Sequence, residues 1–292
     1  MNGIILVDKE AGMTSRDVVN KVGRILNTKR VGHTGTLDPM ATGVLVLCIG
    51  TATKIGELIT CYDKEYVAEI TLGIETDTLD IEGNILKEED ASNVKKAEIE
   101  NVLQTFIGKV EQEVPLYSAI RVNGKRLYDY ARHHIDVELP KREIEIHELT
   151  LLDEIAYNND KVTFKIKCHV SKGTYIRSLV RDIGVKLGYP ATMSSLRRIR
   201  QGNFKIEDCY TIENIEHNKY KLLKANDVLP DMEQMIIDKE TEFKVRNGAF
   251  IDKTFTSDLV KIITSDGEMI AIYQTVDGDS SKAKPFKMLI WW

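Results

Sequence analysis

The sequence of 292 residues predicts a mixed α/β (α+β) fold with a largely antiparallel sheet and a small β-rich domain at its C-terminus. Runs with strand composition alternate with amphipathic helical segments, but without the regular strand–helix repeat of a parallel sheet. Near residue 238 this mixed pattern gives way to short apolar runs separated by Gly and Asp turns. We therefore expect one domain over residues 1–238 and a second over residues 239–292.

The elements of the first domain follow from their apolar patterns. Residues 3–8 predict a strand, and a helix is expected to start at Thr-Ser-Arg-Asp, residues 14–17. The apolar run at residues 44–49 predicts a buried strand. Further strands are expected over residues 65–72, 144–152 and 162–170, and helices over residues 97–106 and 178–187, the second ending at Gly188.

The C-terminal segment is expected to contain only short strands. Its apolar runs lie at residues 242–251, 259–264, 269–273 and 286–292. The pair Asn247-Gly248 lies inside the first run and indicates a β-hairpin, because Asn-Gly favours the tight turn between two strands.

The composition limits the class of protein. A hydrophobic content of 42% is ordinary for a globular chain, and no apolar run approaches the roughly 20 residues that span a membrane. The apolar run at residues 4–7 is too short for a secretory signal and follows no basic residue, so we expect none. The four cysteines are scattered without a Cys-x-x-Cys pair, which disfavours zinc and favours a reducing compartment. We expect a cytoplasmic protein that needs no membrane and no metal.

Charge is unevenly distributed along the chain. The formal net charge is −5, yet residues 161–205 contain eleven Lys and Arg residues and a single acid, Asp182. A local basic region on an acidic protein can bind phosphates, since screening confines charge interactions to about 10 Å. The alternative is a solvated charged surface without a partner.

Residues 32–43, Gly-His-Thr-Gly-Thr-Leu-Asp-Pro-Met-Ala-Thr-Gly, form the most informative segment. They place one carboxylate, Asp38, in a loop of small and turn-forming residues just before the buried strand. A lone carboxylate suits a nucleophile or a general base better than a metal site, which needs several ligands. A tight turn in which Asp38 is only a local cap is the alternative.

This segment resembles the signature of the TruB family of bacterial tRNA pseudouridine synthases. Three further motifs match in order: Asp-Lys-Glu-Tyr at residues 63–66, Ser-Lys-Gly-Thr-Tyr-Ile-Arg at 171–177 and Ser-Ser-Leu-Arg-Arg at 194–198. The resemblance extends over residues 3–235, with one departure: Lys9 precedes Glu10 where the family commonly has proline. It implies a cofactor-free isomerase that converts uridine 55 in the T-loop of tRNA to pseudouridine.

The resemblance also implies roles for particular residues. Asp38 would be the catalytic nucleophile, Tyr66 would stack on the flipped-out uracil, and Arg177 would pair with Asp38 and keep it ionised. Residues 115–142 resemble a thumb-like RNA-binding insertion, and the C-terminal domain resembles a PUA-type domain. The residues expected to contact substrate are His33, Tyr175, Leu196, Lys9, Lys172, Arg197, Arg198, Arg126 and Tyr128.

Several alternatives stay open at this point. Attack of Asp38 on C6 of uracil or on C1′ of ribose, or formation of a glycal, fits the sequence equally. The rival functions are an RNA-binding module without chemistry and a phosphate-binding transferase, although the chain lacks a Gly-Lys-Ser/Thr loop. The expected partner is the T-arm of tRNA, bound by a monomer that requires no protein partner.

Overall fold

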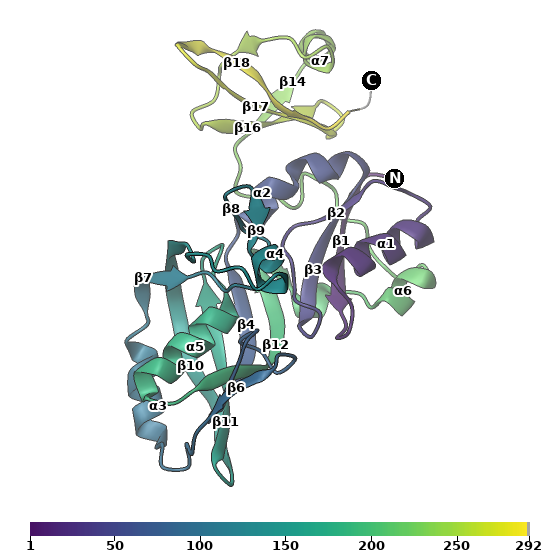
Figure 1. Cartoon of the computed structure of the whole chain (residues 1–292). Coiled ribbons are helices and arrows are strands. Elements are labelled where there is room, and N and C mark those ends of the chain that lie inside the picture. The colour runs from purple at the N-terminus through teal and green to yellow at the C-terminus, as the bar shows by residue number, and fades with distance from the viewer. Residues whose placement is uncertain (291–292) are drawn as a thin grey trace.

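The computed structural model describes residues 1–290, apart from the side chains of residues 153 and 154. Two bodies are visible, a large mixed α/β domain and a small β-rich domain formed by the C-terminal part of the chain (Figure 1). Among the described residues, no helix is both long and apolar enough to cross a bilayer.

A nine-stranded sheet organises the large domain. Its main path runs β1-β3-β12-β4-β11-β10-β7, with β2 added beside β3 and β13 beside β12. Every pair is antiparallel except β3 with β12, so the expected largely antiparallel sheet is confirmed. The strands are β1 (Gly3–Lys9), β2 (Val31–His33), β3 (Thr42–Ile49), β4 (Lys64–Leu72), β7 (Gly108–Glu113), β10 (Lys141–Asn158), β11 (Lys161–Val170), β12 (Ala191–Gln201) and β13 (Phe204–Lys205).

Six helices accompany this sheet, together with 3-10 turns at Gly50–Ile55 and Ile206–Asp208. They are α1 (Ser15–Ile25), α2 (Gly56–Thr60), α3 (Lys96–Gln104), α4 (Leu127–Arg132), α5 (Ile176–Leu187) and α6 (Ile212–Glu216). Thr14 and Asp17 cap α1 reciprocally, each side chain accepting from the other's backbone N–H. Gly188 ends α5 with a φ of +83°, a conformation that favours glycine. Both expected helix boundaries are therefore confirmed.

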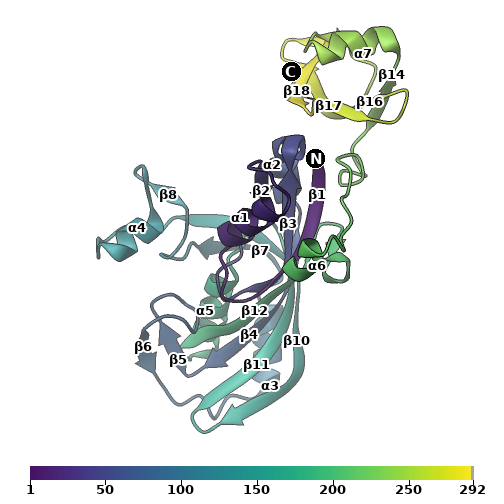
Figure 2. The same ribbon diagram turned by 90° about the vertical axis from the view of Figure 1, so that its right-hand side faces the viewer.

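Two hairpin extensions leave the main sheet. The first consists of β5 (Ile74–Thr76) and β6 (Ile85–Glu88). The second consists of β8 (Arg121–Val122) and β9 (Lys125–Arg126), continues into α4, and projects away from the body (Figure 2). This projecting segment lies inside residues 115–142, where the thumb-like insertion is expected.

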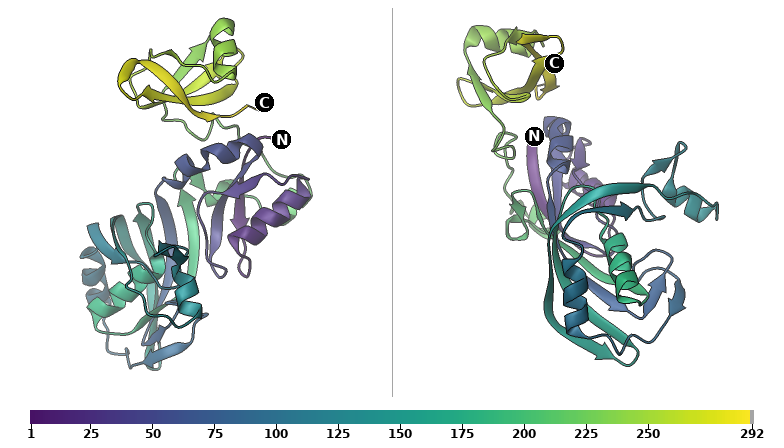
Figure 3. Two further views of the ribbon diagram at one scale, coloured as in Figure 1. Left: turned by 45° about the horizontal axis from the view of Figure 1, so that its top comes forward. Right: turned by 90° about the vertical axis from the view of Figure 1, so that its left-hand side faces the viewer.

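The small domain is a curved five-stranded sheet in the order β14-β16-β17-β18-β15, with one helix beside it (Figure 3). Its elements are β14 (Gln234–Ile237), α7 (Lys239–Arg246), β15 (Ile251–Asp252), β16 (Leu259–Thr264), β17 (Met269–Val276) and β18 (Asp279–Met288). The strands expected at 259–264 and 269–273 are confirmed. Of the strand expected at 286–292, residues 286–288 lie in β18, and residues 291–292 lie outside the described residues.

Two expectations for this domain are wrong. The residues expected to form a hairpin around Asn247-Gly248 instead form α7 and its C-terminal cap, with Gly248 at a φ of +70°. A left-handed glycine closes a helix as readily as it makes a tight strand turn, so the dipeptide alone does not separate the two. The boundary also falls earlier than residue 238, because β14 already pairs with β16.

Apolar side chains join the two domains. Ile263, Met269 and Leu289 of the small domain belong to the same buried cluster as Val44 and Val46 of β3. β18 contacts the turn at Gly50–Ile55 that follows β3, and Lys54 Nζ donates to the Met288 carbonyl at 2.7 Å, so the small domain lies at that end of the large domain.

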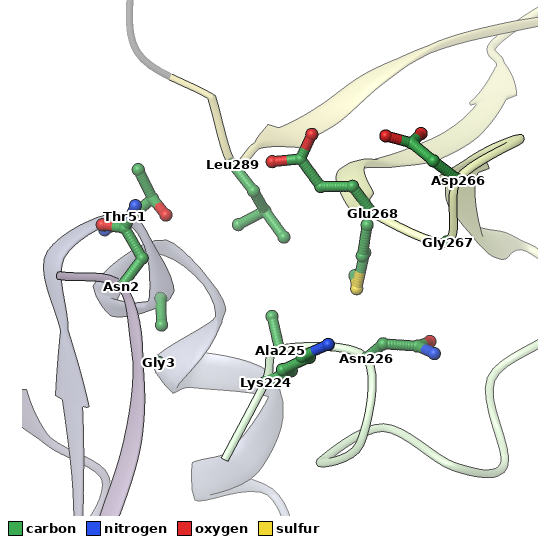
Figure 4. A pocket seen from close by; sticks show the side chains of 12 residues that line it. Asn2, Gly3, Thr51, Lys224, Ala225, Asn226, Asp266, Gly267, Glu268 and Leu289 are labelled. Atoms are coloured by element: carbon green, nitrogen blue, oxygen red, sulfur yellow. The ribbon is translucent and has the colours of Figure 1, made fainter. Parts of the chain in front are cut away.

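A cavity of about 400 Å³ lies beside this junction (Figure 4). Asn2 and Thr51 line it from the large domain, Asn226 from the connecting segment, and Glu268 and Leu289 from the small domain. None of the residues expected to act on substrate lines this cavity, so the catalytic site lies elsewhere.

Candidate active site

Hydrogen bonds from two neighbouring elements hold the Asp38 loop, which connects β2 to β3. Ser15 Oγ donates to the Leu37 carbonyl at 3.1 Å and accepts from the Leu37 N–H at 2.9 Å. Lys9 Nζ donates to the carbonyl of Pro39 at 3.0 Å. The residues on both sides of Asp38 are thus fixed to α1 and β1, which presents the carboxylate in a defined position.

The structure explains why residue 43, at the end of this loop, is glycine. Its φ is +102°, and a Cβ atom at this position would lie 2.1 Å from the carbonyl oxygen of Arg198. The backbones of β3 and β12 meet here in parallel. Only glycine permits this approach, which brings β12 alongside the end of the Asp38 loop.

Arg177 contacts the Asp38 carboxylate through two nitrogens. Its Nε lies 2.9 Å from Asp38 Oδ2, and its Nη2 donates to Oδ1 at 3.3 Å. The guanidinium is 7% exposed and the carboxylate side chain 33% exposed, so the aspartate keeps an open side. A planar two-pronged contact of this kind orients a carboxylate as well as neutralising it.

The remaining donors of Arg177 are also occupied. Nη1 donates to the Thr78 carbonyl at 2.9 Å, and Nη2 donates to the Tyr117 carbonyl at 3.0 Å. Asp80, itself buried, places Oδ2 3.7 Å from Nη1. Arg177 therefore connects the Asp38 loop with the segments around both hairpin extensions, and all three segments fix its position.

A cavity of about 340 Å³ opens beside Asp38 and Arg177. Tyr66, Tyr175 and Leu196 supply apolar walls, and the projecting segment contributes Tyr117, Ser118, Ala119 and Tyr128. Burial raises the pKa of both Tyr66 and Tyr175, which keeps the two phenols neutral. Flat aromatic and branched apolar walls next to one fixed carboxylate suit a planar base removed from its stack.

A larger cavity of about 930 Å³ adjoins the first and shares Tyr66 and Tyr175 with it. Cationic side chains dominate its charged lining: Lys64, Arg121, Lys141, Arg142, Lys172 and Arg198 stand against Glu143. Burial lowers the pKa of Lys64 to about 8. His33 lines the same cavity, and burial, then Arg16 and Arg198, lower its pKa, which favours the neutral imidazole.

The structure brings together most residues that the sequence assigned to the site. Asp38, Tyr66, Arg177, Tyr175, Leu196 and Tyr128 share the smaller cavity, while His33 and Lys172 line the larger one. Arg126 lies on the projecting segment, where Nη1 donates to the Tyr128 hydroxyl.

Three of the basic residues expected to contact substrate also have partners within the protein, and one of them, Arg198, lines the larger cavity. Lys9 and Arg198 are buried, and both donate to backbone carbonyls, Lys9 to that of Pro39 and Arg198 to that of Val44. Arg197 forms an ion pair with Asp8 at 2.8 Å. The long stems of Lys and Arg let their charged ends reach internal carbonyls, so a basic run is not a continuous surface.

Asp80 and the carbonyls of Thr78 and Tyr117 are the part of the site that sequence reasoning missed. Asp80 lies in an acid-rich stretch that reads as a solvated surface. Its buried position follows from the hairpin extension folding back, since Ile81 N–H donates to the Met193 carbonyl of β12 at 3.0 Å. No local pattern distinguishes such an aspartate from its exposed neighbours.

Comparison with known proteins agrees with this geometry. Residues 23–176 match the family model described as TruB family pseudouridylate synthase (N terminal domain). Residues 177–240 match that of the tRNA pseudouridylate synthase B C-terminal domain. With the Asp38–Arg177 pair at a base-sized cavity, these matches define an isomerase of the pseudouridylate synthase class. The chain belongs to the TruB family.

Relatives and solved structures extend this result. The chain is 44% identical to the tRNA pseudouridine synthase B of Listeria welshimeri over 303 residues, covering 99% of this chain and 98% of the relative. Identity to the Bacillus velezensis protein of the same name is 41% with the same coverage. A solved Cbf5-Nop10-Gar1 complex contains a chain with a TM-score of 0.71 and 26% identity, covering 99% of this chain and 85% of that one.

Proposed function

We propose that this protein isomerises uridine 55 in the T-loop of tRNA to pseudouridine, with Asp38 as the nucleophile. The main supporting observation is the position of the Asp38 carboxylate. Two nitrogens of Arg177 contact it, and its open side faces a cavity lined by Tyr66 and Tyr175. The names of the related tRNA pseudouridine synthases support tRNA as the substrate class.

The reaction needs no external reactant. The bond between N1 and C1′ breaks, the uracil turns within the pocket, and C5 bonds to C1′. The proton leaves C5 and N1 gains one, so the product is an isomer of the substrate. A cavity with walls on several sides can hold the detached uracil through this rearrangement, which is why the smaller cavity suits the step better than a flat surface.

Each residue of the site has a task in this scheme. Arg177 contacts both carboxylate oxygens of Asp38 and fixes its direction of attack. The ring of Tyr66 replaces the stacking that the base loses when it leaves the T-loop. Attack on C6 of uracil, attack on C1′ of ribose and a glycal route all begin with the same oriented carboxylate.

The larger cavity and the projecting segment supply the RNA-binding surface. Lys172, Arg142 and Arg121 would contact phosphates next to the flipped base, and Arg126 with Tyr128 would approach from the projecting segment. We infer that one arm of tRNA is sufficient for these contacts, and that the enzyme works as a cytoplasmic monomer.

The test uses an unmodified tRNA transcript carrying tritium at C5 of uridine, with neither nucleotide nor metal added. We expect tritium release equal to one site per tRNA, and chemical mapping should place pseudouridine at position 55 alone. A T-arm stem-loop should be modified at the matching uridine, and a transcript with cytidine at position 55 should release no tritium.

The rival functions give different results in the same assay. An RNA-binding module would retain the transcript on a filter without releasing tritium. A phosphate-binding transferase would require a nucleotide or a divalent ion before any change in the RNA. Either result would overturn the proposal.

A further inference from the structure

Strand β4 has a second functional face that the isomerisation does not use. Tyr66 is buried on the catalytic side, whereas Glu65 points to the opposite side of the sheet. Asp63, which directly precedes the strand, lies close to two histidines from neighbouring strands of the sheet. Its Oδ2 lies 3.1 Å from Nε2 of His147 on β10 and 3.9 Å from Nε2 of His169 on β11.

We propose that Asp63, His147 and His169 form a binding site for a zinc-class divalent ion. Two imidazole nitrogens with one carboxylate oxygen are a donor set that zinc accepts, with a fourth position left for water. One ligand atom from each residue lies within 4.8 Å of the others. No sequence pattern indicates this site. The scattered cysteines suggest no metal site, and successive members of this ligand set lie more than 20 residues apart along the chain.

The distances are close to what a bound ion requires. Ligand atoms about 2.0–2.1 Å from zinc in a tetrahedron are separated by about 3.3 Å. The two measured distances to Asp63 bracket this value, so the imidazoles need only turn inward. All three side chains are partly exposed, at 30%, 25% and 45% for His147, His169 and Asp63, which leaves room for that turn and for a solvent ligand.

Backbone contacts hold the three ligands in place. The Gly202 N–H donates to the Asp63 carbonyl at 2.8 Å. His169 on β11 pairs with Glu148 of β10, and His147 lies in the β-bulge just before it, with the two imidazole ring centroids 4.7 Å apart. A bound ion would therefore tie three neighbouring strands together, and we expect it to stabilise the fold.

Arg200 is the competitor for this site. Its Nη2 lies 3.3 Å from His169 Nε2, the nitrogen that would bind the ion, and also pairs with Glu65. Entry of a cation requires the guanidinium to turn fully toward Glu65. Removing the positive charge of Arg200 should therefore raise metal affinity, a result that a chance ion pair between Asp63 and His147 would not produce.

The experiment uses the full chain with any affinity tag removed and metal stripped by chelation. Cobalt(II) serves as the probe, because its visible spectrum reports tetrahedral nitrogen and oxygen ligands, and zinc is then measured by competition. We expect one ion per chain for the wild type. His147→Gln, His169→Gln and Asp63→Asn should each weaken binding more than about tenfold, and Arg200→Met should strengthen it.

His217→Gln is the matched control, since His217 lies on the C-terminal cap of α6 outside the cluster. It should bind cobalt as the wild type does, and zinc should raise the Tm of both. Circular dichroism without metal checks that every variant folds. Wild-type binding equal to that of the His147→Gln/His169→Gln double variant would overturn the proposal, as would a sulfur-to-cobalt charge-transfer band that disappears in Cys61→Ser.

Discussion

An arginine–carboxylate pair lies near each side of β4, and the two pairs differ in which partner is buried. Beside the Asp38 cavity, the Arg177 side chain is 7% exposed and its carboxylate partner 33% exposed. On the outer face, Arg200 is 31% exposed and its partner Glu65 only 15% exposed. Water can replace the carboxylate beside Arg200 but not the partners of Arg177. The comparison teaches that burial of the arginine, more than its presence beside a carboxylate, fixes the geometry of an ion pair.

The buried pair also depends on parts of the chain outside the main sheet. The carbonyls of Thr78 and Tyr117 accept from Arg177, and they come from the segments around the two hairpin extensions. The sheet positions Tyr66 and Leu196, whereas the extensions position the guanidinium. A substitution in either extension that moves Arg177 should therefore also change the position of the Asp38 carboxylate.

The same substitution on each face tests the comparison most strongly. Arg177→Lys keeps the charge but loses the two-pronged contact, and a misplaced carboxylate should lower the single-turnover rate by about 10²-fold or more. Arg200→Lys, the matched control, should leave this rate within about twofold, because Arg200 lines neither of the two cavities beside Tyr66. Equal losses in both variants would mean that burial does not separate the two faces.

Tyr66→Leu should cause the next largest loss in single-turnover rate. Leucine fills part of the cavity but removes the ring face and the hydroxyl, so the chemical step should slow by about 10²-fold while tRNA affinity falls little. Single-turnover rates and filter binding separate the two effects. Should affinity fall as much as the rate, Tyr66 would be a general RNA contact.

Asp80→Asn should have a smaller effect through the same guanidinium. The amide keeps the shape and can still accept from Thr78 Oγ1, which lies 2.6 Å from Asp80 Oδ1. Loss of the second carboxylate should loosen the orientation of Arg177 and slow the single-turnover rate by about tenfold. The Arg177→Lys/Asp80→Asn double variant should lose less than the product of the single losses, whereas a simple product would place Asp80 outside this network.

Arg200→Gln should show the smallest change. Loss of a partly exposed pair with Glu65 should lower the free energy of unfolding by about 1 kcal/mol or less. Urea denaturation followed by circular dichroism measures it. A loss several times larger would show that the outer face contributes a fixed pair comparable to the catalytic one.

Local patterns predicted the elements whose ends carry their own signals. Thr14 and Asp17 cap α1 as the sequence indicated, and Gly188 ends α5. Asn247-Gly248 was misread because a left-handed glycine serves both a hairpin and a helix end. Residues around such a glycine need tertiary information before the two are separated.

Within the site, sequence reasoning found the residues of continuous motifs and missed those that depend on distant folding. Asp38, Tyr66 and Arg177 each lie in a recognisable string, and the fold brings them together. Asp80 depends on an extension packing against β12, which no spacing encodes. The sequence shows the charge of Lys9 and Arg198 but not their burial.

The central claim is that Asp38 is the nucleophile of a cofactor-free isomerisation. The most direct measurement compares the single-turnover tritium release of wild type and Asp38→Asn on one tRNA transcript, with tRNA affinity measured in parallel. The amide keeps the size of the side chain but removes its charge, so we expect release to fall by about 10⁴-fold or more while affinity stays nearly unchanged. Release near the wild-type rate in a folded Asp38→Asn preparation would contradict the claim.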